Sequence, residues 1–140
     1  MTDAPTSTNA AMAVASSALR AQQARMKVIA ENIANADSTA TTPGGDPYQR
    51  QTPQFQPKPA AGGGMGVAMV GVAPDTTPFK REYSPGNPGA DAQGYVKTPN
   101  VDALTESLDM REAQRAYEAN LNVIETARAM QSSTLDLLKN

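Results

Sequence analysis

The sequence contains no cysteine and no histidine. Without cysteine the chain can form neither disulfides nor thiolate nucleophiles, and it tolerates an oxidising or a reducing compartment equally. Without histidine it lacks the commonest general base, and the two absences together remove the usual ligands of transition metals. Most familiar catalytic and metal-binding arrangements are therefore excluded, and we expect neither enzyme activity nor a cofactor.

Large apolar side chains are scarce as well. The chain has no tryptophan, aromatic residues make up 4%, and much of the 39% hydrophobic fraction is alanine, which buries little area. A chain of 140 residues with this composition has the length of one domain but lacks the material for a thick core. Charge is nearly balanced, with 12 basic and 14 acidic residues, so nothing favours binding to nucleic-acid phosphates.

Long apolar runs are absent too. The first twenty residues contain neither a basic stretch nor a continuous apolar stretch, which predicts that no cleavable signal peptide is present. No later segment approaches the roughly 20 apolar residues that a membrane-spanning helix needs. We therefore expect neither Sec targeting nor a direct membrane span.

Glycine and proline are confined almost entirely to the middle of the chain. All ten glycines lie between Gly44 and Gly94, and ten of the eleven prolines lie between Pro43 and Pro99. Because Gly and Pro cost roughly 1 and 3 kcal/mol in a helix interior, this distribution predicts a continuous helix at each end. The predicted order is a polar extension over 1–9, a helix over 10–36, a Gly/Pro-rich segment over 37–99 and a helix over 100–138.

The first predicted helix carries an apolar stripe with a seven-residue spacing. Its members are Met12, Leu19, Met26 and Ile33, with Ile29 three residues beyond Met26. This spacing is typical of a coiled-coil seam. Ala15 and Gln22 occupy the other seam positions, so an ordinary amphipathic core helix remains an alternative.

The second predicted helix has a longer apolar stripe. Its members recur at three- and four-residue steps: Val101, Leu104, Leu108, Met110, Ala113, Tyr117, Leu121, Ile124, Ala127 and Met130. The other face carries charges of both signs, which is typical of a solvated, helix-supporting surface.

Short strands and turns are predicted for the middle segment. Gly66–Val72 and Phe79–Tyr83 have the composition of strands. Ser84–Gly89 predicts a turn, and Gly62–Gly64 predicts a flexible joint. The predicted fold is therefore mainly α, with long N- and C-terminal helices packing as a coiled-coil-like pair and a small irregular β-containing middle.

Carboxylates are the remaining candidates for chemistry. The loop residues Asp37, Asp46, Asp75 and Asp91 lack the spacing of a calcium loop, so solvated turn residues explain them better. The run Gly62–Gly66 lacks the Lys-Ser or Lys-Thr of a phosphate-binding loop. The apolar stripes, in contrast, exceed what the small middle can cover. They predict packing against each other and against neighbouring subunits.

Two motifs resemble those of the flagellar rod and hook axial family. The first is Ile29–Asp37 followed by Pro43–Gln51, and the Thr-rich insert between them is typical of the FlgC branch of that family. The second consists, in order, of Gly94–Val101, Glu106, Met110 and Arg115–Asn120. The two motifs occur in the order that the family has. One departure is Ala18, where the family commonly has glycine; alanine favours a straighter helix there.

The resemblance implies a structural subunit of the proximal rod, polymerising through its terminal helices into the drive shaft that transmits torque and encloses the export channel. The implied partners are further copies of the chain, the rod proteins FlgB, FlgF and FlgG, FliE, the membrane ring at the rod base and the flagellar type III export apparatus. The implied location is the basal-body rod crossing the periplasm, reached by export without a cleaved signal peptide.

The apolar stripes and the motif asparagines together form the predicted assembly interface. Its residues are Met12, Leu19, Met26, Ile29, Asn32, Ile33, Asn35, Leu104, Leu108, Met110, Tyr117, Asn120, Leu121, Ile124 and Met130. Asn35 is interpreted as a helix cap. Asn120 lies in mid-helix, where an inter-helix hydrogen bond and simple exposure are both open.

Other functions remain open from the sequence alone. The chain could be a different type III-exported axial subunit, or a secreted helical adaptor or effector that binds one target. A carboxylate-based hydrolase acting on peptidoglycan is a third reading, for which no catalytic pair can be nominated. Formation of a polymer distinguishes the first reading from the others.

Overall fold

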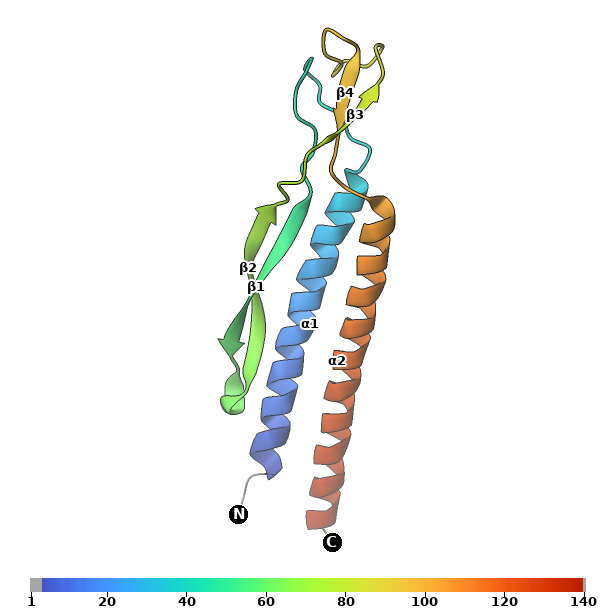
Figure 1. Ribbon diagram of the computed structural model, residues 1–140. Coiled ribbons are helices and arrows are strands. Elements are labelled where there is room, and N and C mark those ends of the chain that lie inside the picture. The colour runs from blue at the N-terminus through green and yellow to red at the C-terminus, as the bar shows by residue number, and fades with distance from the viewer. Residues whose placement is uncertain (1–3, 140) are drawn as a thin grey trace. The chain divides into compact units, whose positions relative to one another are not determined.

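The computed structural model describes residues 4–139, which form two long helices and two small sheets (Figure 1). In chain order the elements are α1 (Ala4–Ala34), β1 (Gln51–Pro59), the 3-10 turn η1 (Ala61–Gly63), β2 (Met65–Pro74), β3 (Lys80–Tyr83), β4 (Tyr95–Thr98) and α2 (Ala103–Leu138). The predicted mainly α class with a β-containing middle is confirmed. Neither α1 nor α2 has a stretch that is both long enough and apolar enough to cross a membrane.

The described chain forms two compact units. Unit 1 contains the N-terminal segment up to Met26, Gln54–Gly71 and the C-terminal segment from Glu112 onward. Unit 2 contains Lys27–Pro53 and Val72–Arg111. β1 and β2 pair as a two-stranded ribbon, and β3 and β4 form a second sheet. Both helices and the β1–β2 ribbon therefore contribute residues to each unit.

In unit 1, α1 and α2 run antiparallel. The Gln131 side chain donates to Asn9 Oδ1 at 2.7 Å, and Arg25 approaches Glu112 at 3.6 Å, so residue numbers rise along α1 as they fall along α2. The buried side chains of these helices in unit 1 are small, apart from one isoleucine: Ala15, Ala21, Ala113, Ala127 and Ile124. Alanine permits close approach but buries little area, so the pair depends on many small contacts.

The tip of the β1–β2 ribbon packs tightly on α1 within unit 1. Ser17 Oγ donates to Val14 O at 2.7 Å and accepts from Val67 N at 3.1 Å. A Cβ on Gly66 would lie 2.4 Å from Ser17 Oγ, and one on Gly64 would lie 2.7 Å from Val14 Cγ2. Glycine is needed here because the ribbon approaches the helix closely. This run of glycines is a close-packed turn rather than the flexible joint that composition predicts.

Unit 2 contains the end of α1, the start of α2 and the β3–β4 sheet. The two strands pair antiparallel, with Lys80 opposite Thr98 and Tyr83 opposite Tyr95. The buried apolar side chains of this unit are Val28, Ile29, Val96, Pro99 and Val101. So few buried apolar side chains make a small core, which leaves polar contacts a large share in holding the unit together.

Side-chain caps set the helix ends in unit 2. Asn35 Nδ2 donates to Glu31 O at 2.8 Å, beside the Asn35 backbone amide, which donates to the same carbonyl at 3.1 Å, so Asn35 caps the last turn of α1 as predicted. Asp102 precedes α2, and its carboxylate accepts from Leu104 N at 3.1 Å and Thr105 Oγ1 at 3.0 Å. Because Asp102 is the N-cap, α2 begins at Ala103, later than the boundary expected at residue 100.

Some elements differ from the expectation. α1 includes the described residues 4–9, because the only helix breaker among them, Pro5, lies in the first turn, where proline is tolerated. The two predicted strands lie largely in β2 and β3. β1 and β4 carry no clear sequence signal. β1 holds three prolines, which only a strand with free edges accommodates, and β4 has four residues.

Gly94 provides a test of the turn before β4. Its φ is +84°, and an added Cβ would lie 2.8 Å from Tyr83 Cε2. We expect Gly94→Ala to lower the free energy of unfolding by about 1–3 kcal/mol, because alanine is strained in the left-handed region. Urea unfolding followed by circular dichroism measures this loss. Gly86→Ala is the control, since nothing lies within 4 Å of its Cβ, and an equal loss in both variants would contradict the argument.

Candidate assembly surfaces

The structure divides the predicted interface residues into two sets. Buried or half-buried are Met12, Leu19, Met26, Tyr117, Asn120 and Ile124 in unit 1 and Ile29, Asn32, Asn35 and Met110 in unit 2. Exposed are Leu121 and Met130 in unit 1 and Ile33, Leu104 and Leu108 in unit 2. The first set serves the packing of the subunit itself, whereas the second is accessible to another molecule.

α2 presents a line of exposed apolar side chains in unit 1. Val123, Met130 and Leu137 are seven residues apart, and they are 45%, 62% and 79% exposed. A seven-residue step keeps side chains on nearly the same side of a helix. Met130 and Val123 also line a groove between the two helices, together with small residues of α1 such as Ala11. Sequence reasoning missed Val123 and Leu137, although their spacing marks them.

In unit 2, in addition to Ile33 and Val72, exposed apolar side chains form two pairs. Leu104 and Leu108 are one turn apart on α2 and are 71% and 57% exposed. On the β3–β4 sheet, the exposed rings of Tyr83 and Tyr95 meet edge to face at 5.3 Å, and Arg81 lies 5.0 Å from the centroid of the Tyr95 ring. Clustered exposed apolar side chains are typical of interaction surfaces.

Asn32 is satisfied inside unit 2. Its Nδ2 donates to Gln51 O at 2.9 Å and to Glu106 Oε2 at 3.3 Å, while its Oδ1 accepts from Gln51 N at 2.9 Å and Tyr48 OH at 2.8 Å. Burial, followed by the nearby carboxylates of Glu31 and Glu106, raises the pKa of the Tyr48 phenol, which keeps this donor protonated. Asn32 therefore acts within the subunit, where it ties α1 to the start of β1 and to α2.

Glu106 is a fully buried carboxylate on α2. Arg50 Nε donates to Glu106 Oε1, so the two form a buried ion pair. The same guanidinium contacts Asp75 Oδ2 at 3.1 Å and approaches Asp109 Oδ2 at 3.8 Å. One partly buried cation thus holds three carboxylates from two segments of the chain.

Asn100 extends this network into the loops. Its Oδ1 accepts from Arg50 N at 2.8 Å, and its Nδ2 donates to Asp75 O at 3.0 Å and Thr77 O at 2.9 Å. We name Asn32, Arg50, Asp75, Asn100 and Glu106 the polar hub of unit 2. The sequence analysis placed all five residues in motifs or loops without giving them this joint role.

Asn120 behaves differently from both expectations for it. Its Nδ2 donates to Ala116 O of its own helix at 2.8 Å, and the residue is half-buried. The amide thus makes neither an inter-helix hydrogen bond nor a purely exposed contact. Bonding to the carbonyl four residues earlier is a common solution for a polar side chain in mid-helix.

Comparison with protein families identifies two matching regions. Residues 12–40 match the family described as flagella basal body rod protein. Residues 92–137 match the C-terminal family described as flagellar basal body rod FlgEFG protein. The matches cover α1 from Met12 onward and almost all of α2.

Comparison with curated proteins extends the similarity over most of the chain. The chain is 48% identical to the flagellar basal-body rod protein FlgC of Agrobacterium fabrum, covering 94% of this chain and 95% of that protein. It is 46% identical to the FlgC protein of Salmonella typhimurium, covering 89% and 92%. It is 34% identical to the FlgC protein of Bacillus subtilis, covering 90% and 95%.

Removing Arg50 tests the polar hub. We expect Arg50→Ala to lower the free energy of unfolding by about 3–5 kcal/mol, because the buried Glu106 carboxylate loses its cation. Arg81→Ala is the matched control, since Arg81 pairs with Asp91 in the same unit but is 54% exposed. An exposed pair contributes about 0–1 kcal/mol. Urea unfolding compares the two, and similar losses would show that burial of the pair does not matter.

Acid should weaken the hub through Asp75. Hydrogen bonds from the Thr77 hydroxyl and amide, with a smaller effect of Arg50, lower the pKa of Asp75 from its ordinary value of 3.8. The stabilisation is therefore fully present above that value and is lost as the pH falls through the folded-state pKa. We expect Asp75→Asn to be less stable than the parent at neutral pH and to lose less stability on acidification.

Thr77→Val provides the control for this pH effect. It removes the hydroxyl donor but keeps the amide donor, so it should weaken the acid dependence only in part. Unfolding curves measured at several pH values between neutral and strongly acidic conditions give the comparison. Parallel pH profiles for Asp75→Asn and the parent would contradict the role of this carboxylate.

Proposed function

Because the chain belongs to the FlgC family of flagellar basal-body rod proteins, it is a structural subunit of the rod, and we propose that it polymerises through its terminal helices into the shaft that transmits torque and encloses the export channel. The observation that carries the proposal is the exposed apolar surface of α2. In unit 1 it comprises Val123, Met130 and Leu137, and in unit 2 it comprises Leu104 and Leu108.

The energy that each exposed side chain can contribute indicates that assembly needs many simultaneous contacts. Fully burying one aliphatic side chain contributes about 1.5–3 kcal/mol, whereas association costs about 4–15 kcal/mol in lost motional freedom. One leucine pair is therefore insufficient, and contacts are needed along the part of α2 in unit 1 and along the part in unit 2. A subunit that meets neighbours through unlike surfaces builds a ring or an open helical assembly, whereas a two-fold dimer pairs the same surface on both copies.

The polar hub supports assembly indirectly in this proposal. Asn32 and Glu106 are occupied within unit 2, so they offer nothing to a neighbour. They fix the start of α2, on which Leu104 lies two residues before Glu106. Rigid presentation of exposed side chains lowers the entropy lost on association.

The partners of such a subunit follow from its place in the rod. We propose that it contacts further copies of itself, the rod proteins FlgB, FlgF and FlgG, FliE and the membrane ring at the rod base. The flagellar type III apparatus would export it without a cleaved signal, and the rod would carry it across the periplasm. Membership of the rod family supports assembly with other rod and basal-body components, and the named partners and the export route are proposed on that basis.

The proposed role is structural, which the description of the rod family supports. The three carboxylates that converge at Arg50 are neutralised in part by that cation and belong to the packing of unit 2. Family membership also disfavours the reading of a secreted adaptor that binds a single target.

Leu104 and Leu108 provide the test of the proposal. We expect Leu104→Asp with Leu108→Asp to leave the isolated subunit folded, since both side chains are exposed, but to abolish its recovery with basal bodies and to abolish motility. The control is Leu104→Met with Leu108→Met, which keeps an apolar surface and should assemble. Motile cells whose purified basal bodies contain the aspartate variant would overturn the proposal.

A further inference from the structure

We propose that the groove between α1 and the β1–β2 ribbon in unit 1 receives the α2 face of a second copy that carries Glu118, Leu121 and Glu125. The inference rests on the proposed polymerisation and adds which two surfaces meet. The groove and the α2 face are unlike surfaces of the same chain. Their contact is therefore heterologous, and its repetition adds further copies in a ring or a helical array instead of stopping at a dimer.

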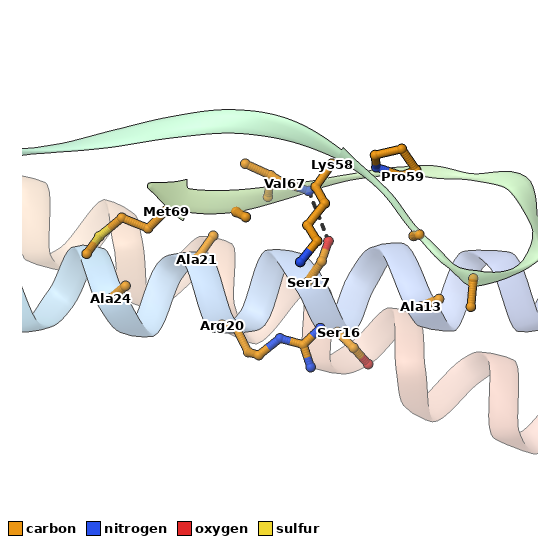
Figure 2. A pocket seen from close by; sticks show the side chains of 13 residues that line it. Ala13, Ser16, Ser17, Arg20, Ala21, Ala24, Lys58, Pro59, Val67 and Met69 are labelled. Atoms are coloured by element: carbon orange, nitrogen blue, oxygen red, sulfur yellow. Dashed lines mark hydrogen bonds between the residues drawn. The ribbon is translucent and has the colours of Figure 1, made fainter. Parts of the chain in front are cut away.

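The groove is apolar and walled by small side chains (Figure 2). Ala13, Ala21 and Ala24 line it from α1, and Ala68 lines it from β2. The Ser17 hydroxyl, which could otherwise demand a polar ligand, is already bonded to Val14 O and Val67 N. An aliphatic side chain inserted here would therefore not leave the Ser17 hydroxyl unpaired.

Two cations stand beside this apolar groove. Figure 2 shows Lys58 reaching from the ribbon toward Ser17, whereas Arg20 projects from α1. Both residues are exposed. Over residues 4–139, no ion pair involves either side chain, although seven such pairs form elsewhere. The groove therefore favours an occupant that combines an aliphatic side chain with carboxylates.

The α2 face around Leu121 has this composition. Glu118 lies three residues before Leu121 and Glu125 lies four residues after it, so all three share one side of the helix. All three are exposed, and within the described chain neither glutamate takes part in an ion pair. Arg115 and Arg128 lie one turn beyond on either side, which confines the acidic face to this stretch.

The α2 face that enters the groove belongs to a second copy and not to the subunit that forms the groove. α2 already meets α1 of its own subunit through the side that bears Gln131 and Glu112. Leu121 is 38% exposed and does not line the groove of its own subunit. The face is therefore still available to another molecule after the subunit has folded.

Charge reversal tests the pairing. We expect Arg20→Glu with Lys58→Glu to reduce the subunit recovered with basal bodies by about tenfold or more, because like charges would then face each other. Glu118→Lys with Glu125→Lys should do the same. The four substitutions together should restore recovery to within about twofold of the parent, since the charges are again complementary. Loss in each double variant without rescue in the combined variant would overturn the pairing.

Introduced cysteines test the contact without changing its charge. The chain has no cysteine, so two subunits expressed together, one with Ala68→Cys and one with Leu121→Cys, can form a disulfide only between copies. We expect cross-linked dimers in oxidised basal bodies, and none when Val123→Cys replaces Leu121→Cys, because Val123 lies on another side of α2.

Three results would separate the possible failures. Subunits that enter basal bodies but give no Ala68–Leu121 cross-link would overturn this inference and leave the proposed function intact. A cross-link from Ala68→Cys to a different protein carrying an introduced cysteine, with none between copies, would overturn the second copy as occupant. Absence of the unsubstituted chain from basal bodies would overturn the proposed function itself.

Discussion

The buried carboxylate of Glu106 constrains the rest of unit 2. A charged group without solvent must be paired and hydrogen-bonded, and among the described residues Arg50 and Asn32 meet this need. Arg50 immediately precedes β1, Asn32 lies in the last turns of α1, and Glu106 lies in the first turns of α2. The network therefore joins three segments that are distant in the sequence. The network specifies the arrangement of the unit as well as contributing to its stability.

In unit 1 the main constraint is the scarcity of large apolar side chains, and not a buried charge. There the helices pack through alanines, and most of the larger aliphatic side chains of α2 remain on the surface. In a monomeric enzyme such exposed leucines would cause unwanted association. For a rod subunit the same feature is useful, since the side chains withheld from the subunit core are the ones that neighbours can bury. The weak internal core and the capacity to polymerise are two results of one composition.

The sequence predicted the helices well because their signals are local. The absence of Gly and Pro from both ends and the capping side chain of Asn35 each act within a few residues. The hub could not be predicted, because Arg50, Asp75 and Glu106 are far apart in the chain and no periodicity links them. The apolar stripes showed which residues are apolar but not which face the subunit buries: Ile124 and Leu121 belong to the same predicted stripe yet have different exposure. The placement of the ribbon on α1 depended on tertiary contacts at Gly64 and Gly66.

Charged side chains have different functions inside unit 2 and on the surface of unit 1. Within unit 2 the Arg50 ion pairs are buried or partly buried, so they are little screened by salt and hold the fold in one arrangement. On the outer surface of unit 1 the charges are solvated, and each contributes little to affinity. They can still select the register between helices, because a shift by one turn along α2 would bring Arg115 or Arg128 against Arg20 or Lys58. An alanine-lined groove alone would accept many registers of an apolar helix, and the acidic residues on both sides of Leu121 remove most of them.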